Sequence, residues 1–383
     1  MRIAIITNII TPYRKRFYDE MFAQLRTAGD EFRVYAMTDS LPLRPWTFED
    51  LKSSYMTLLP GKKIVLKMQD MDILFNPQVN RYIREYNPDI AILAGSWTYP
   101  TVMQMLFWKN EGTKYLFWAE SHEYRAGNTE VRSKGLLSRL KKSLYEKFDG
   151  FCVPGRYANE SITRIVGEKG LRLRLPNLVD NDYYIEANVM RQDRESLRKK
   201  YELPNDKVVF VTPSRLIPRK GIDMFLSSIK GLPDNNRSIF LLAGEGPLEY
   251  SIKQIAEEDG MEVRLLGYCN QETVRELYAA SDIFLLPSLS DPNPLTVIEG
   301  AFAGLPLLVS EYTGNNPELC HNGVNGIVFK TDNPASVISA YTEIMSKSKD
   351  WLQQAGADSL RIAKDNFDCR NEVSKFIELL KTI

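Results

Sequence analysis

Two carboxylates lie eight residues apart in the stretch SDPNPLTVIEG, residues 290–300. Asp291 stands in its polar part and Glu299 in its apolar part. Asn293 suits a helix N-cap and Pro294 suits the first helical position, so the pattern predicts a helix that begins at Pro294. Because helical side chains lean toward the N-terminus, Glu299 is expected to reach back toward the loop that holds Asp291.

The first turn of this predicted helix is suited to binding a phosphate. Its free backbone amides fall at Leu295 and Thr296, and the positive end of the helix dipole adds to their attraction for an anion. The two flanking carboxylates are poor partners for phosphate but good acceptors for sugar hydroxyls. The stretch therefore predicts a ligand with a sugar on each side of a diphosphate, which is a nucleotide sugar. The alternative is that Asp291 is a turn residue and Glu299 a solvated helix residue.

Cations that suit a diphosphate occur in a second stretch, PSRLIPRKGID, residues 213–223. Arg215 offers a planar fork of donors and Lys220 a compact positive charge, and both bind phosphate oxygens well. The alternative is that both side chains solvate a surface loop. In LLAGEGPLEY, Gly244 permits a tight turn and a close approach to a ligand, although many α/β turns carry glycine for geometry alone.

A parallel sheet is needed to bring these motifs together. Short β-rich runs alternate with longer amphipathic stretches in two series. We expect strands of the first series at 2–7, 33–37, 90–93, 115–118, 150–153 and 171–175. Those of the second series are expected at 207–212, 239–243, 262–266, 283–286, 306–310 and 327–329. The pattern predicts two Rossmann-like α/β domains, with ligands at the carboxyl ends of the strands and a cleft between the domains.

The length of 383 residues also favours two domains. We assign residues 1–180 to the first domain and 206–365 to the second, with the charged, strand-poor segment 181–205 as the linker. Lys plus Arg and Asp plus Glu both number 49, which removes any global electrostatic argument for nucleic acid. The four cysteines are widely spaced, so the sequence predicts neither disulfides nor a zinc site and favours a cytoplasmic setting. No signal peptide or membrane-spanning segment is predicted, so we expect a soluble or peripheral protein.

The order of motifs in the second half resembles the group 1, or family 4, retaining glycosyltransferases of GT-B fold. The motifs are PSRLIPRKG, LLAGEGP, LLGY, AASDIFLLPS, the Asp-x7-Glu pair, GAFAGLPLLVS and HNGVNGIVF. The resemblance implies that Arg215 and Lys220 bind the diphosphate of the donor and that Glu299 holds the ribose hydroxyls. It assigns Asp291 to the donor sugar, although the family usually has Glu there, one methylene longer. Tyr268 and Cys269 fall in the segment that frames the nucleotide base.

The first half resembles the family less specifically. In TNIITPYRKRFY, Thr11, Tyr13 and Arg14 are expected to face the cleft and contact the acceptor. In FWAESHEYR, His122 follows a strand where the family places a histidine near the donor sugar; the alternative is a structural histidine. Trp97 is a further candidate for the acceptor site, although aromatic residues at helical spacing usually belong to a core. LPNLVD resembles the interdomain crossover, and residues 366–383 resemble the final helix, which returns to the first domain.

The resemblance implies a retaining enzyme that moves a sugar from a nucleotide-diphosphate sugar to a glycan or lipid-linked acceptor in cell-surface polysaccharide assembly. The nucleotide sugar is a co-substrate and no further cofactor is expected. No metal is expected either, since Arg215, Lys220 and the helix N-terminus neutralise the leaving diphosphate. No side-chain nucleophile is visible, which favours a front-face, oxocarbenium-like step. Two alternatives stay open: a sugar-nucleotide epimerase of the same fold, and a non-catalytic nucleotide-sugar binding protein.

A basic amphipathic segment, residues 132–148, is a candidate for contact with an anionic membrane surface. It places Leu136, Leu140, Leu144 and Phe148 on one helical stripe, with Arg132, Lys134, Arg139, Lys141, Lys142 and Lys147 against the single acidic residue Glu146. The alternative is that the stripe packs on the sheet of the first domain while the cations stay in water. The family resemblance favours the membrane, so we expect a cytoplasmic enzyme that is peripheral at the inner face of the cell membrane.

Overall fold

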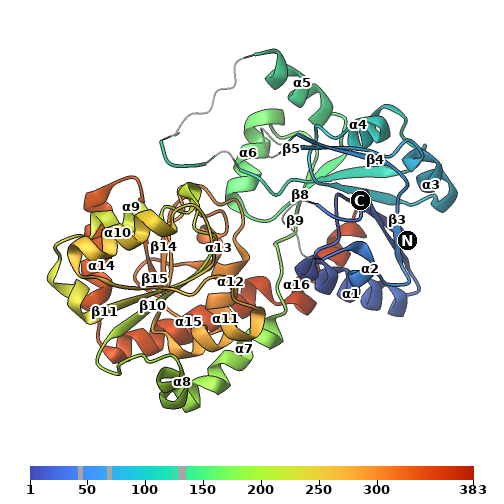
Figure 1. The fold of residues 1–383 in the computed structure, drawn as a ribbon. Helices are drawn as coiled ribbons and strands as arrows, with labels where there is room; N and C mark the ends of the chain where they lie inside the picture. The colour runs from blue at the N-terminus through green and yellow to red at the C-terminus, as the bar shows by residue number, and fades with distance from the viewer. Residues whose placement is uncertain (42–45, 67–70, 123, 128–134) are drawn as a thin grey trace. The chain divides into compact units, whose positions relative to one another are not determined.

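The computed structural model describes residues 1–41, 46–66, 71–122, 124–127 and 135–383, and the chain divides into two compact units (Figure 1). Unit 1 contains Met1–Ser121, Arg132–Val179 and Cys369–Ile383. Unit 2 contains His122–Val131 and Asp180–Asp368. The chain therefore passes between the units four times.

Unit 1 is built on a seven-stranded parallel sheet in the order β3-β2-β1-β6-β7-β8-β9. Its strands are β1 (Arg2–Thr7), β2 (Glu31–Ala36), β3 (Met56–Leu58), β6 (Ile90–Ala94), β7 (Lys114–Trp118), β8 (Gly150–Val153) and β9 (Leu171–Arg174), and β4 (Lys62–Leu66) and β5 (Met71–Phe75) form a separate antiparallel hairpin. Its helices are α1 (Pro12–Thr27), α2 (Phe48–Leu51), α3 (Val79–Tyr86), α4 (Pro100–Phe107), α5 (Leu136–Tyr145), α6 (Arg156–Val166) and α16 (Cys369–Leu380). The central strands are continuous apolar runs because helices cover both faces of the sheet.

Unit 2 is built on a six-stranded parallel sheet in the order β12-β11-β10-β13-β14-β15. The strands are β10 (Val208–Pro213), β11 (Ser238–Ala243), β12 (Glu262–Leu265), β13 (Ile283–Leu286), β14 (Leu307–Ser310) and β15 (Gly326–Phe329). The helices are α7 (Asn181–Met190), α8 (Arg194–Lys200), α9 (Ile222–Ser228), α10 (Glu249–Asp259), α11 (Gln271–Ala280), α12 (Leu295–Phe302), α13 (Asn316–Leu319), α14 (Pro334–Met345) and α15 (Lys349–Phe367), with short 3-10 turns η1 (Arg191–Asp193), η2 (Pro218–Lys220) and η3 (Pro233–Arg237). This strand order is that of a Rossmann fold, in which the first and fourth strands meet at the switch point.

The α/β class and both parallel sheets are confirmed, and the twelve expected strands are all present with ends that differ by at most two residues. The sequence missed β3, which has only three residues, and the hairpin β4–β5. The return of the C-terminal helix to the first unit is observed, with α16 beginning at Cys369. There it contacts α1 through Phe376 and Phe17, whose ring centroids lie 6.5 Å apart.

Unit 2 ends at Asp368, three residues after the predicted domain, and it differs from that domain in two larger ways. Segment 181–205 is not a linker but forms α7, η1 and α8, which belong to unit 2. Arg194 and Arg198 both pair with Asp282, and Arg191 donates to the carbonyl oxygens of Tyr278 and Ser281. The charges that suggested a solvated linker therefore fasten these helices to α11 and β13. Residues 122–131 also belong to unit 2, although the sequence around them belongs to unit 1.

Candidate functional site

The loops after β10 and β13 carry the two oppositely charged residues that the sequence placed in separate motifs. Lys220 ends η2, and Asp291 lies in the loop before α12. The Lys220 ammonium forms an ion pair with Asp291 Oδ2, and the two side chains are only 12% and 10% exposed. Since β10 and β13 are neighbours at the switch point, the topology explains why these distant residues meet.

Arg215 lies on the same loop as Lys220 but is exposed. Its guanidinium makes no hydrogen bond or ion pair with the part of the chain that the structure describes. Gly244 supports this loop from β11, because a Cβ atom there would lie 2.1 Å from the carbonyl oxygen of Ser214. The structure therefore explains Gly244 by the packing of two loops, and its contact with a donor stays a prediction.

The start of α12 differs from the predicted helix by one position. The helix begins at Leu295, and Pro294, with an extended backbone, is the N-cap. No side chain in the described ranges caps this helix, so Asn293 does not compete for the amides of its first turn. The main-chain carbonyl of Pro294 accepts from Asn315 Nδ2 at 2.8 Å. Within the described part of the chain, the first-turn amides, which include those of Leu295 and Thr296, have no side-chain partner, as the predicted phosphate site requires.

Glu299 lies in the middle of α12 between two tyrosines. Tyr278 of α11 donates from its hydroxyl to Glu299 Oε2 at 2.9 Å, and Tyr184 of α7 also donates to this carboxylate. Burial raises the pKa of Glu299 to about 7, although both tyrosine hydroxyls favour the ionised form. The carboxylate is thus held in place by two helices, and its predicted contact with ribose hydroxyls stays a prediction.

His122 lies beside the loop after β14, which the sequence analysis did not single out. A Cβ atom on Gly314 would lie 1.6 Å from the carbonyl oxygen of Pro292 and 2.8 Å from His122 Nε2. The main-chain N–H of Gly314 donates to the carbonyl oxygen of Asp291 at 2.8 Å. Burial lowers the pKa of His122, which favours the neutral ring near the Asp291 loop. The position of Gly314 after a buried strand was the signal that could have found this loop.

Buried polar atoms without a hydrogen bond gather on the loops at the carboxyl ends of β13, β14 and β15. Ser288 Oγ, Thr313 Oγ1 and Thr331 Oγ1 belong to fully buried residues and have no hydrogen-bond partner among the described residues, and the same is true of both polar atoms of the half-buried Asn293 side chain. Buried polar groups of native proteins are nearly always paired, because leaving one unpaired costs about 1–3 kcal/mol. The concentration of such atoms around Asp291 fits a site that a polar ligand completes.

The residues expected to frame the nucleotide base lie after β12. Tyr268 is 74% exposed, and its main-chain N–H lies 3.3 Å from Glu245 Oε1. Cys269 is half-buried, and burial raises the pKa of its thiol. The exposed ring of Tyr268 is free to stack on a base, whereas Cys269 is a neutral thiol.

The predicted acceptor residues belong to unit 1. Arg14 is buried, forms an ion pair with Glu120, and donates to Thr7 Oγ1 at 2.9 Å while its guanidinium lies 4.9 Å from the centre of the Trp118 ring. Arg14 therefore orients Glu120, a carboxylate just past the end of β7 that the sequence analysis missed.

The other predicted acceptor residues occupy different surroundings. Thr11 is the N-cap of α1 and is buried, and its Oγ1 has no hydrogen bond with the residues that the structure describes. Tyr13 is half-buried, and Trp97 packs against the core of unit 1. The contacts of these residues with an acceptor stay predictions.

The basic amphipathic segment is partly core and partly surface. Leu144 and Phe148 are buried in unit 1, whereas Leu136 and Leu140 are 83% and 43% exposed. Leu137 is 73% exposed on the same helix, α5. Arg132 and Lys134 lie outside the described residues. The predicted leucine stripe thus divides at the middle of α5 into an exposed and a buried half.

No helix in the described ranges has both the length and the apolar composition needed to cross a bilayer. Among the same residues, no three His, Cys, Asp or Glu side chains gather closely enough to hold a metal ion. The expectations that no metal and no cofactor are needed stay predictions.

The two Rossmann-like units define the class of the fold, which is GT-B, as in solved glycosyltransferase structures. Sucrose-phosphate synthase from Thermosynechococcus elongatus is similar with a TM-score of 0.73 and 16% identity, covering 100% of this chain and 98% of that chain. The Anabaena protein HepE, solved in complex with UDP and glucose, is similar with a TM-score of 0.72 and 16% identity, and both chains are fully covered.

Sequence comparisons find similarity to one family. Residues 193–356 match the model described as glycosyl transferases group 1. The Escherichia coli UDP-Gal:alpha-D-GlcNAc-diphosphoundecaprenol alpha-1,3-galactosyltransferase is 28% identical over 214 residues, or 55% of this chain and 51% of that protein. The alpha-galactosylglucosyldiacylglycerol synthase of Streptococcus pneumoniae is 26% identical over 186 residues, or 46% of this chain and 48% of that protein. The chain spans about half the length of the curated relatives it matches.

Proposed function

We propose that this protein is a retaining glycosyltransferase that moves a sugar from a nucleotide-diphosphate sugar to a glycan or lipid-linked acceptor. The observation that carries the proposal is the meeting of Lys220, Asp291 and the uncapped start of α12 at the switch point of unit 2. These groups offer a cation, a carboxylate and free amides within one group of loops. That combination suits a diphosphate joined to a sugar.

Lys220, Arg215 and the first-turn amides of α12 stabilise the diphosphate as it leaves. Negative charge develops on its oxygens when the glycosidic bond breaks, and donors already held in place stabilise that charge without reorganising. Lys220 is paired with Asp291, so the incoming diphosphate takes over the ammonium and releases the carboxylate. Arg215 is exposed and can move to the ligand.

Asp291 is then free to accept a hydrogen bond from a hydroxyl of the donor sugar. His122 and the unpaired hydroxyl of Thr313 are further polar groups for this sugar. Glu299 accepts ribose hydroxyls in place of, or beside, those of Tyr184 and Tyr278. Retention proceeds through a front-face, oxocarbenium-like step, without a side-chain nucleophile and without a metal.

The acceptor is a component of surface-glycan assembly, taken up through unit 1. Support comes from the E. coli relative, whose name describes transfer to a diphosphoundecaprenol-linked sugar, and from HepE, which was solved with UDP and glucose. The exposed Leu136, Leu137 and Leu140 of α5, with neighbouring Arg139, Lys141 and Lys142, support contact with the inner face of the membrane.

The test is a panel of UDP, GDP and ADP sugars, first by thermal shift and then by product analysis. A donor present at 100 times its dissociation constant stabilises the protein by about 2.7 kcal/mol. Transfer to lipid or glycan acceptors with the anomeric configuration kept, as read by NMR, is the expected result. Epimerised nucleotide sugar from donor alone identifies the epimerase, and tight binding with neither transfer nor hydrolysis identifies a binding protein.

A further inference from the structure

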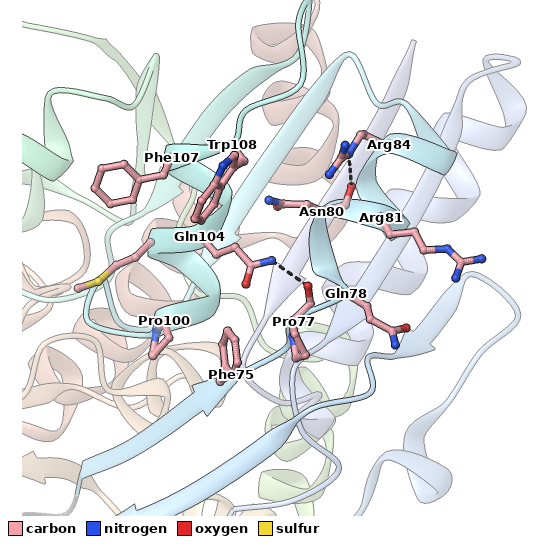
Figure 2. Close-up of a pocket in the computed structure, with 11 residues that line it drawn as sticks. Phe75, Pro77, Gln78, Asn80, Arg81, Arg84, Pro100, Gln104, Phe107 and Trp108 are labelled. Carbon is pink, nitrogen blue, oxygen red and sulfur yellow. Dashed lines mark hydrogen bonds between the residues drawn. The ribbon is translucent and has the colours of Figure 1, made fainter.

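A groove in unit 1 lies between α3 and α4, apart from every residue assigned above (Figure 2). Its volume is about 730 Å³, within the range of roughly 300–1,000 Å³ that small-molecule sites occupy. Six of its eleven lining residues are apolar, among them Phe75, Met103, Phe107 and Trp108. Two of the others are arginines, Arg81 and Arg84, and no acidic residue of the described ranges lines the groove.

The apolar side of the groove is open to solvent. Phe75, Phe107 and Trp108 are 40%, 59% and 65% exposed. Figure 2 shows Phe107 and Trp108 at one end of α4, Phe75 near Pro100 at the other, and Gln104 between them. Exposed apolar side chains gathered at a groove in this way mark a site that an apolar partner covers.

The cationic side of the groove is available to an anion. Arg81 pairs with Glu85 at 2.6 Å, but these side chains are 72% and 58% exposed, and such surface pairs contribute little energy. With the described residues, Arg84 forms one hydrogen bond through its guanidinium, from Nε to the carbonyl oxygen of Asn80 at 3.2 Å. An uncharged apolar partner would leave Arg81 with only its exposed pair to Glu85 and would offer no negative charge to Arg84, whereas a phosphate accepts from guanidinium groups in a bidentate manner.

The groove adjoins two lysines, Lys147 just after α5 and Lys109 just after α4. The Lys147 ammonium lies 5.2 Å from the centre of the Phe107 ring, and Lys109 donates to the main-chain carbonyl of Lys147. Exposed Trp and Phe beside Lys and Arg form the pattern that side chains adopt at the boundary between lipid and water. The positive charge and the exposed apolar side chains thus both favour an anionic lipid over a neutral peptide.

We propose that this groove binds one phosphate-bearing lipid of an anionic bilayer, with its phosphate on Arg81 and Arg84 and part of a chain along Met103, Phe107 and Trp108. Each helix has eight residues and is therefore about 12 Å long, so the groove covers the upper part of an acyl chain while the rest stays in the bilayer. The site stands whether or not the protein transfers sugar.

The test uses dioctanoyl phosphatidic acid below its micelle concentration, with binding measured by calorimetry. Saturable 1:1 binding to the full chain is expected. The double variant Arg81→Gln/Arg84→Gln is expected to bind about thirtyfold more weakly, from about 1 kcal/mol per cation at tenfold per 1.4 kcal/mol. Trp108→Ala is expected to weaken binding about tenfold through lost apolar contact.

The matched control is Arg156→Gln, which removes an arginine of the same unit that is 66% exposed and pairs with Glu160 four residues on, as Arg81 does with Glu85. It is expected to leave lipid affinity unchanged. The proposal is overturned if the wild-type protein does not bind the monomeric lipid, if inorganic phosphate binds as tightly, or if the control loses as much affinity as the double variant. Thermal shift with nucleotide sugars is expected to be the same for all variants, which keeps this test apart from that of sugar transfer.

Discussion

Asp291→Ala is expected to destabilise the free protein while strengthening its binding to nucleoside diphosphates. The Lys220 and Asp291 side chains are 12% and 10% exposed, so the variant leaves a largely buried ammonium without a partner. Breaking a buried pair costs about 3–5 kcal/mol, and the remaining exposure places this pair at the lower end, at about 3 kcal/mol of unfolding free energy. A diphosphate restores a partner to Lys220, so about 1–2 kcal/mol of the loss returns as tighter binding.

The assay compares a nucleoside diphosphate with its monophosphate by calorimetry, beside urea unfolding of the same proteins. Affinity for the diphosphate is expected to rise about 5- to 30-fold, whereas affinity for the monophosphate stays within a factor of about two. Turnover of the donor sugar is expected to fall, since Asp291 no longer meets a sugar hydroxyl. The matched control is Glu262→Ala, which breaks the more exposed pair with Lys207 and is expected to leave both affinities unchanged. Weaker binding of the diphosphate to Asp291→Ala would refute the competition between Asp291 and the ligand for Lys220.

Four further predictions test other parts of the site. Arg215→Ala or Lys220→Ala is expected to lower turnover by roughly 100-fold, as for the loss of one charge-stabilising donor, and unchanged turnover in both would exclude their role at the diphosphate. The pKa of Glu299 is raised from 4.5 to about 7, so the folded protein holds this proton more tightly than the unfolded chain does. The wild-type protein is therefore expected to lose up to about 3 kcal/mol of unfolding free energy as the pH rises from 4.5 to 7. Glu299→Gln, which has no proton to lose there, is expected to show no such loss. Parallel urea titrations of the two proteins at pH 5 and 7.5 measure this difference, and identical pH profiles would contradict it. Gly314→Ala is expected to weaken donor binding in calorimetry at least tenfold, because its Cβ atom would lie 1.6 Å from the Pro292 carbonyl oxygen. Gly135→Ala, whose Cβ atom would meet no atom of the described residues within 4 Å, serves as the silent control. Replacing Arg139, Lys141 and Lys142 by Gln is expected to weaken cosedimentation with anionic vesicles by about 3 kcal/mol at low salt, and wild-type protein that stays in the supernatant would end the membrane proposal.

Local signals predicted the sheets well. Runs such as RIAIIT and IFLL are apolar on both faces, and a buried parallel strand requires that pattern whatever its neighbours are. The residues that follow such strands were therefore placed at the correct edge of unit 2, and Lys220 and Asp291 meet there although 71 positions separate them.

Non-local contacts account for what the sequence did not predict. The sequence predicted a solvated linker at 181–205 because the partners of its arginines lie more than 80 residues away. These partners are the carbonyl oxygens of α11 and the carboxylate of Asp282, which bind Arg191, Arg194 and Arg198. The sequence predicted Asn293 as the N-cap of α12, but the N-cap is Pro294. The carbonyl oxygen of Pro294 accepts a hydrogen bond from Asn315, which lies in the loop after β14. Gly314 carried only one local signal, its position after a buried strand, and the importance of Thr313 depends on the loop that packs against it.

Residues 122–131, the short segment that the first half of the chain contributes to unit 2, bear on how domains can be exchanged between related proteins. Within unit 2, the main-chain N–H of Ala126 donates to the carbonyl of Leu289, Tyr124 donates to Glu311 at 3.0 Å, and the main-chain N–H of Gly127 donates to Asp332 at 3.1 Å. A fusion of two related genes at a single junction near residue 180 would take segment 122–131 from one parent. Its hydrogen-bond partners at 289, 311 and 332 would come from the other parent. Chimeras between relatives should therefore carry residues 122–131 together with 180–368. Along a lineage, substitutions in segment 122–131 are expected to follow those at 289, 311 and 332 rather than those in the flanking sequence.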